Sequence, residues 1–149
     1  MAERVTSYRI LYRDTDAMGL LYYGRYLELF ELGRVEWMRA QGFRYRDMET
    51  GHGLLLPVTA AWCRYLAGLH YDDEARIHTW IRAWSPTTVR FAHRIREAGS
   101  DRVAATGEVE LGCLERRTGR PARIPPSLLA ILEEAAGGRK GRLRGPEGG

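Results

Sequence analysis

Cysteine, lysine and long apolar runs are all scarce in this chain of 149 residues. The two cysteines, Cys63 and Cys113, are too few for a disulfide framework, which favours a protein of the reducing cytoplasm. No stretch is long enough to span a bilayer, and the first residues lack the apolar segment of a signal peptide. The composition therefore predicts a soluble cytoplasmic protein with no integral membrane association.

Patterns typical of metal sites are also missing. The four histidines lack the spacing of metal ligands, and neither cysteine has a visible base that would activate its thiol. Asp14 and Asp16 look like the start of a calcium loop, but the later oxygen ligands and the closing glutamate are absent. We therefore expect no metal and no cofactor. His52, between two glycines, is the one histidine placed to line a pocket.

Basic residues outnumber acidic ones without forming a nucleic-acid surface. The formal net charge is +4, Lys140 is the sole lysine, and the one obvious basic cluster lies at residues 139–144 in a Gly- and Arg-rich tail. Proteins that bind nucleic acids instead gather basic residues with exposed aromatic ones. We expect one folded domain at residues 1–136, a disordered tail at 137–149, no nucleic-acid partner, and attraction for anionic ligands.

Apolar periodicity predicts one long helix near the N-terminus. Residues 4–12 alternate like a half-buried strand, and residues 22–41 repeat with helical spacing. Glu31 and Arg34 are spaced to pair on the flank of this helix. The face that we expect to be buried carries Tyr26, Phe30, Gly33, Trp37 and Ala40.

The rest of the chain predicts a meander of strands. Strands are expected from Val58 and over residues 75–84, 89–95 and 103–114, and a closing helix over residues 126–135. One long helix with about five antiparallel strands predicts an α+β fold in which the sheet wraps around the helix.

The segment between the first strand and the long helix holds the candidate chemistry. Asp14, Asp16 and Gly19 supply turn and cap residues just before the helix. Unpaired N–H groups at a helix start keep a nearby carboxylate ionised, so Asp16 can attack a carbonyl or activate water. The same N–H groups can hold a carbonyl oxygen as it gains negative charge. The alternative is that Asp16 is only the N-cap of the helix.

The segment from Tyr12 to Tyr26 resembles the signature of the hotdog-fold acyl-CoA thioesterases, in the branch that contains 4-hydroxybenzoyl-CoA thioesterase and the Tol–Pal-associated thioesterases. The resemblance continues through Leu56-Pro57-Val58 and Tyr71-Asp72-Asp73 to about Arg116. It implies hydrolysis of an acyl-CoA to a free acid and coenzyme A, which is part of the substrate and not a cofactor. It also implies a homodimer with its active sites at the interface, and a tetramer of two such dimers.

The same resemblance assigns the site residues. The second Asp of the family's Asp-Thr-Asp element is catalytic, which here makes Asp16 the nucleophile or general base. The backbone N–H of Tyr23 matches the oxyanion donor, with Gly19 shaping the turn and Tyr22 beside the substrate. Tol–Pal relatives often carry His at the position of Tyr23, so the mechanism should rest on Asp16 without a His partner. An acyl pocket for short-chain or aromatic groups is expected to involve Leu56 and Pro57 of the neighbouring subunit.

Other functions on the same scaffold stay open. Acyl carrier protein is an alternative carrier of the thioester, and a non-catalytic acyl-CoA-binding or regulatory module is an alternative to an enzyme. A hydratase is disfavoured because no histidine lies between Asp14 and Gln41. The family's basic phosphate-binding turn is replaced here by Ser85-Pro86-Thr87, so the residues that bind the coenzyme A phosphates are not assigned.

Overall fold

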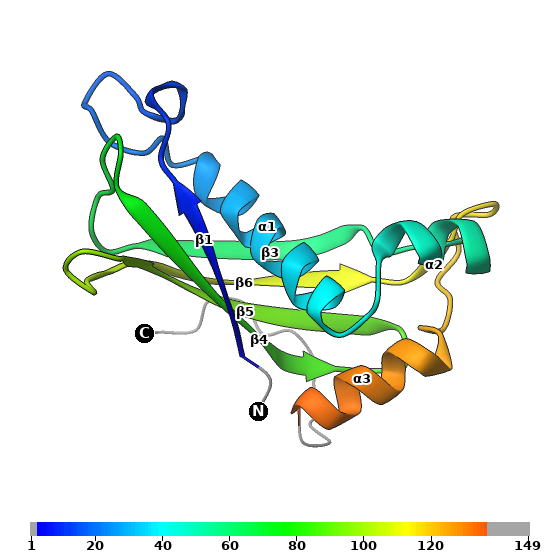
Figure 1. Cartoon of the computed structure of the whole chain (residues 1–149). Coiled ribbons are helices and arrows are strands. Elements are labelled where there is room, and N and C mark those ends of the chain that lie inside the picture. The colour runs from blue at the N-terminus through cyan, green and yellow to red at the C-terminus, as the bar shows by residue number, and fades with distance from the viewer. Residues whose placement is uncertain (1–2, 137–149) are drawn as a thin grey trace.

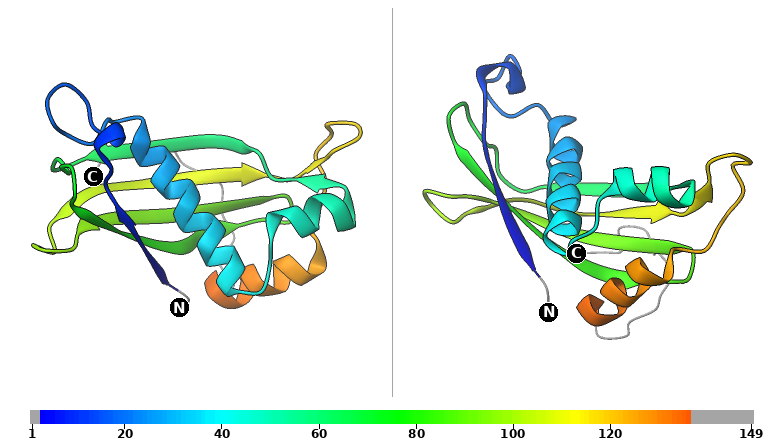
Figure 2. Two further views of the ribbon diagram at one scale, coloured as in Figure 1. Left: turned by 45° about the horizontal axis from the view of Figure 1, so that its top comes forward. Right: turned by 45° about the vertical axis from the view of Figure 1, so that its right-hand side comes forward.

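A computed structural model describes residues 3–136, and the predicted tail at 137–149 lies outside this range. Five strands form an antiparallel sheet, and helix α1 lies across one face of it (Figures 1 and 2). The strands of the sheet are β1 (Arg4–Arg9), β3 (Val58–Tyr65), β4 (Glu74–Trp84), β5 (Thr88–Glu97) and β6 (Val103–Gly112), and the helices are α1 (Arg25–Ala40), α2 (Tyr45–His52) and α3 (Pro126–Ala136). The predicted α+β fold, with a sheet wrapped around one helix, is confirmed.

The sheet has the order β1-β4-β5-β6-β3. Alternation sends every second side chain of each strand toward α1, so that both members of a facing pair point the same way, as in Ile77 opposite Ile95 and Phe91 opposite Val109. These side chains are at most 2% exposed and form the core. The alternation predicted for residues 75–84 and 89–95 is therefore confirmed.

Two glycines let α1 approach the sheet closely. An added Cβ at Gly33 would clash with Thr79 Oγ1 and lie 2.9 Å from a methyl group of Ile77. An added Cβ at Gly107 would lie 2.5 Å from the ring of Phe30. The core of this layer is centred on Phe30 and Trp37, both fully buried, as predicted. Ala40, predicted on the same face, is exposed because it ends the helix beyond the sheet contact.

The predicted boundaries around the first strand and α1 are wrong. β1 ends at Arg9, and residues 12–14 form a 3-10 turn that leaves Tyr12 79% exposed. The helix begins at Arg25 and not at Tyr22, because residues 15–24 form a folded loop of their own. Glu31 and Arg34 form no ion pair among residues 3–136, since Arg34 turns inward and is 8% exposed.

Helix α2 and a small second sheet were not predicted. α2 ends at His52 and is followed by Gly53, whose φ of 63° gives a left-handed C-cap. Just beyond it, β2 (Leu54–Leu55) pairs with β7 (Leu114–Glu115). His52 is the exposed last residue of α2 and not part of a loop.

The two edges of the main sheet differ. β1 pairs only with Glu74–Thr79 of β4, and α3 lies beside the end of β4 that β1 does not reach (Figure 1). On the other edge, β3 pairs with β6 and with no second strand in residues 3–136. Within that range, no helix is long and apolar enough to cross a membrane.

Candidate active site

The loop between Asp14 and Gly24 is held by its own backbone. Asp16 N–H donates to the Leu20 carbonyl at 2.8 Å, and Gly19 N–H donates to the Asp16 carbonyl at 3.0 Å. Gly19 has a φ of 78°, which a residue with a Cβ adopts only at a cost. A 2.7 Å hydrogen bond from Leu21 N–H to the Leu69 carbonyl joins this loop to the loop at residues 68–73.

Asp16 uses one carboxylate oxygen to brace this loop. Its Oδ1 accepts hydrogen bonds from Met18 N–H at 2.9 Å and from Leu20 N–H at 3.3 Å. Its Oδ2 has no hydrogen-bond partner in residues 3–136, and the residue is half-buried. The N-cap of α1 is Gly24, so the interpretation of Asp16 as that cap is wrong. The arrangement fixes the carboxylate and leaves one oxygen available for chemistry.

The two tyrosines after the turn have different backbone roles. Tyr22 N–H donates to the Asp14 carbonyl at 2.9 Å, whereas Tyr23 N–H has no acceptor among residues 3–136. Of Tyr22 and Tyr23, only Tyr23 therefore has a backbone N–H that can donate to the carbonyl oxygen of a substrate. The Tyr22 ring contacts the Tyr23 ring, with centroids 4.7 Å apart.

Exposed aromatic side chains surround this loop. Tyr65, the last residue of β3, donates its hydroxyl to the Tyr23 carbonyl at 3.1 Å, and its ring packs edge-on against Tyr26 at 5.0 Å. Tyr23 and Tyr65 are 63% and 47% exposed. The site therefore opens outward, beside the free edge of β3.

Asp14, which the sequence indicated only as a turn or cap residue, is buried. Its side chain is 4% exposed, and Oδ2 accepts hydrogen bonds from the Tyr8 hydroxyl at 2.7 Å and Leu11 N–H at 2.8 Å. Its Oδ1 lies 3.8 Å from Arg25 Nε, at the start of α1. A buried carboxylate needs such donors to offset its lost hydration.

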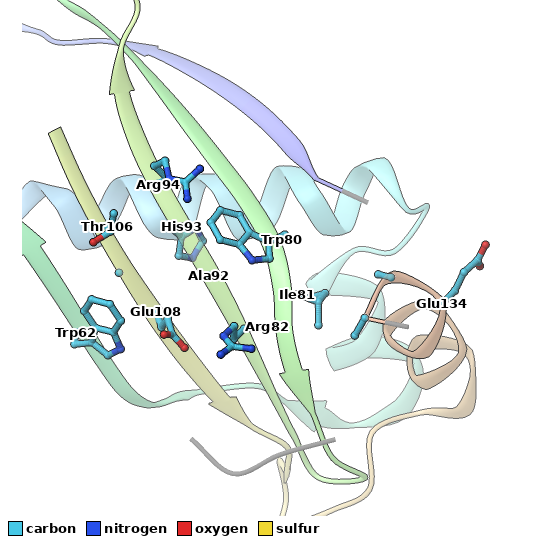
Figure 3. Close-up of a pocket in the computed structure, with 13 residues that line it drawn as sticks. Trp62, Trp80, Ile81, Arg82, Ala92, His93, Arg94, Thr106, Glu108 and Glu134 are labelled. Atoms are coloured by element: carbon cyan, nitrogen blue, oxygen red, sulfur yellow. The ribbon is translucent and has the colours of Figure 1, made fainter. Parts of the chain in front are cut away.

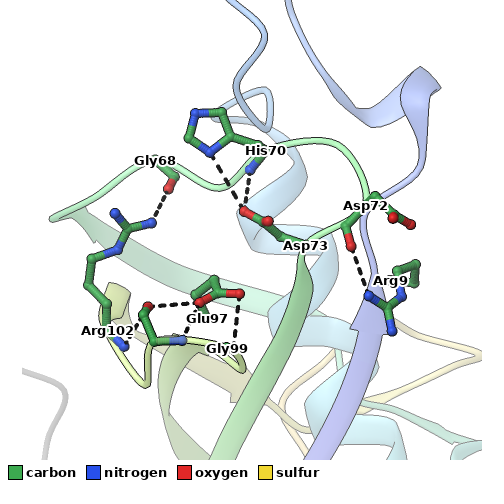
Figure 4. A network of polar contacts seen from close by, with 9 residues as sticks. Arg9, Gly68, His70, Asp72, Asp73, Glu97, Gly99 and Arg102 are labelled. Atoms are coloured by element: carbon green, nitrogen blue, oxygen red, sulfur yellow. Dashed lines mark hydrogen bonds and ion pairs between the residues drawn. The ribbon is translucent and has the colours of Figure 1, made fainter.

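The loop at residues 68–73 packs beside the site and is built from polar contacts (Figure 4). His70 N–H donates to Asp73 Oδ2 at 2.8 Å, and Arg9 Nη1 donates to the Asp72 carbonyl at 2.8 Å. An isolated bridge between Leu20 and His70 joins this loop to the Asp16 turn.

The predicted acyl-pocket residues do not meet Asp16 within one chain. Leu56 and Pro57 precede β3, whereas the Asp16 loop contacts Tyr65 at the opposite end of that strand. Leu56 is half-buried and Pro57 is exposed.

A cavity lies on the face of the sheet opposite α1 (Figure 3). It measures about 740 Å³, and Arg94 stacks over Trp80 at 5.5 Å beside it. Neither Asp16 nor His52 lines it. Residues 3–136 also hold no group of three or more His, Cys, Asp or Glu able to bind a metal.

Comparison with known proteins places the chain in a family. Residues 10–132 match the model of the thioesterase-like superfamily. YneP of Bacillus subtilis, named as a candidate acyl-CoA thioesterase, is 34% identical over 77% of this chain and 82% of its own length. The acyl-CoA thioester hydrolase YbgC of Escherichia coli is 28% identical over 85% of this chain and 92% of its own length.

The fold agrees with solved structures of the same kind. A DHNA-CoA thioesterase from Staphylococcus aureus superposes with a TM-score of 0.82 at 29% identity, over 92% of this chain and 90% of that one. The predicted hotdog fold and thioester-hydrolase class are confirmed. The chain belongs to the thioesterase-like superfamily.

Proposed function

We propose that the protein hydrolyses an acyl-CoA thioester to a free acid and coenzyme A. The observation that carries this proposal is that one short loop presents both a carboxylate oxygen, Asp16 Oδ2, and a backbone donor, Tyr23 N–H, that have no hydrogen-bond partner among residues 3–136. Unused hydrogen-bonding capacity of both kinds is what attack on a carbonyl requires. The names of YbgC and YneP support the substrate class.

Two routes use these groups. In the first, Asp16 Oδ2 attacks the thioester carbon, the sulfur leaves as the coenzyme A thiolate, and water then cleaves the mixed anhydride. In the second, Asp16 takes a proton from a water that attacks the same carbon. In both, Tyr23 N–H donates to the carbonyl oxygen as it becomes negative. Trapping the anhydride with hydroxylamine distinguishes the first route.

The free edge of β3 supports a homodimer. Two copies of β3 can pair in antiparallel fashion about a twofold axis, which satisfies the open edge. This pairing brings the start of one β3 to the end of the other, so the partner's Leu56 and partner's Pro57 would approach Tyr65 and the Asp16 loop. The groove of about 220 Å³ beside Leu27 and Val58, both partly exposed, would be covered in the same dimer. A tetramer would pair two such dimers.

The acyl group is proposed to be short-chain or aromatic. The exposed rings of Tyr22, Tyr23 and Tyr65 line the open side of the site, and such rings pack well against planar acyl groups. The similar S. aureus structure is that of a DHNA-CoA thioesterase, which agrees with an aromatic acyl group. Cytoplasmic location and free coenzyme A, in preference to acyl carrier protein, stay predictions.

Release of free thiol from a panel of acyl-CoAs tests the proposal. Short aliphatic, long aliphatic and aromatic thioesters would be assayed at equal concentration, next to acyl carrier proteins that carry the same groups. The proposal expects turnover of at least one short or aromatic acyl-CoA. Tight binding measured by calorimetry, without any thiol release, would instead identify a non-catalytic binding module.

A further inference from the structure

Asp14 is tied to three separate parts of the fold. Its Oδ2 joins β1 through the Tyr8 hydroxyl and closes the 3-10 turn through Leu11 N–H. Its Oδ1 faces Arg25, the first residue of α1. The backbone carbonyl of the same residue accepts the hydrogen bond from Tyr22 N–H.

This carbonyl places the neighbouring amide. Tyr22 N–H is held by the Asp14 carbonyl, whereas the next N–H along the chain, that of Tyr23, has no acceptor in the described residues. A shift of the Asp14 backbone would displace the peptide between Leu21 and Tyr22, which directly precedes the peptide that carries the proposed oxyanion donor. Oxyanion donors act only when they are held at the position of the developing charge.

Asp14 itself is poorly placed to react. It is 4% exposed, and its Oδ2 already accepts two hydrogen bonds. By contrast, Asp16 is half-buried, and its Oδ2 has no hydrogen-bond partner in the part of the chain that the structure describes. The two acidic residues of the same turn thus have different environments, and only one of them can meet a substrate.

We infer that Asp14 is a positioning residue, whose buried carboxylate fixes the Asp14–Tyr22 hydrogen bond and thereby the Tyr23 N–H that faces the thioester carbonyl. This inference rests on the proposed hydrolysis. The Asp14 carboxylate anchors the turn through its hydrogen bonds with Tyr8 and Leu11, and the Asp14 backbone carbonyl accepts the hydrogen bond from Tyr22 N–H.

A graded set of variants tests the inference by kinetics. Tyr8→Phe removes one hydrogen bond to Asp14, Asp14→Asn removes the charge at constant size, and Asp14→Ala removes every side-chain contact. We expect kcat to fall in that order, reaching about 10²-fold for Asp14→Ala, since misplacement by about 1 Å has that effect, while KM stays within about threefold.

Glu97→Gln provides the matched control. Glu97 accepts hydrogen bonds from Gly99 N–H, Ser100 N–H and the Ser100 hydroxyl in the hairpin between β5 and β6 (Figure 4), and none of these partners lies in the loop between Asp14 and Gly24. If Asp14 had a purely structural role, Asp14→Asn and Glu97→Gln would show equal losses of kcat whenever their melting temperatures fell by the same amount. Retention of kcat by Asp14→Ala, or an equal loss in Glu97→Gln, would overturn the inference.

Amide hydrogen exchange tests the same inference without turnover. Loss of the Asp14 anchor should speed exchange of Tyr22 N–H in Asp14→Ala, by about tenfold or more, while amides of the central strands keep their protection. Unchanged exchange at Tyr22 would contradict the inference even if the wild type were active. If the wild type released no thiol from any substrate, the proposed function would fail, and exchange at Tyr22 would still decide whether Asp14 holds the loop.

Discussion

His93 should make the stability of the fold depend on pH. Its ring is 1% exposed, stacks on Phe30 with centroids 4.6 Å apart, and hydrogen-bonds Thr79 through Nδ1 at 3.0 Å. Nε2 has no partner in residues 3–136. Burial, together with the charge of Arg34, holds the pKa of His93 well below its usual value of 6.5. The folded protein therefore keeps this ring neutral where an unfolded chain would protonate it.

Proton linkage gives the direction and the size of this pH dependence of stability. With a folded pKa below the unfolded pKa, the unfolded chain binds the extra proton, so the contribution of His93 to stability falls as the pH drops below about 6.5 and is constant above it. A single histidine that takes no proton in the folded state costs about 2 kcal/mol between pH 7.5 and pH 5. Urea unfolding at these pH values, at one fixed protein concentration, measures this loss.

His93→Gln is the matching variant because glutamine does not titrate and its amide can still bond Thr79. The variant is expected to be less stable at every pH, since the aromatic stacking on Phe30 is lost. Its free energy of unfolding should nevertheless fall by about 2 kcal/mol less than that of the wild type between pH 7.5 and pH 5. Equal pH dependence in the two proteins would refute the account of the buried ring.

Three further predictions concern other parts of the fold. Gly33→Ala should lower the free energy of unfolding by about 1–3 kcal/mol, because the added methyl group overpacks the contact with Ile77 and Thr79, and urea titration measures this. Burial raises the pKa of Cys63 to about 11, so iodoacetamide at pH 8 should modify this thiol at least about tenfold more slowly than a free cysteine, as mass spectrometry can show. Treatment with iodoacetamide should also leave the rate of thiol release from acyl-CoA unchanged. Ala61→Arg places a charge in the groove beside β3 and should yield a folded monomer with reduced turnover, whereas a dimer by light scattering would contradict the proposed interface.

The layers of this fold were predictable from the sequence because they depend on side-chain periodicity. The alternation around Ile77 and Ile95 and the helical spacing of Phe30 and Trp37 reflect burial, which local sequence records directly. The boundaries were less predictable. Nothing in the alternation separates Tyr12 from the strand before it, although hydrogen bonds from Asp14 N–H to the Leu11 carbonyl and from Thr15 N–H to the Tyr12 carbonyl close a 3-10 turn there.

The site was predicted in part. Asp16, Gly19 and Tyr23 lie in one loop as the resemblance implied, and Gly19 has the positive φ expected of a turn glycine. Spacing alone does not encode which of the two backbone groups, Tyr22 N–H or Tyr23 N–H, is already hydrogen-bonded. It also does not encode the burial of Asp14, because both features depend on three-dimensional contacts. The catalytic and pocket roles of these residues and of Leu56 and Pro57 stay predictions, the last two because they would require a second copy of the chain.

Thiol release by Asp16→Asn is the most direct test of the central claim. An asparagine carbonyl can keep the hydrogen bonds from Met18 N–H and Leu20 N–H, so the loop should remain folded while the charged oxygen is lost. Asp73→Asn, in the neighbouring loop, is the control for removal of an acidic group. The account predicts a fall in kcat of at least about 10²-fold for Asp16→Asn and a near-normal rate for Asp73→Asn. Near-normal thiol release by a correctly folded Asp16→Asn protein would contradict it.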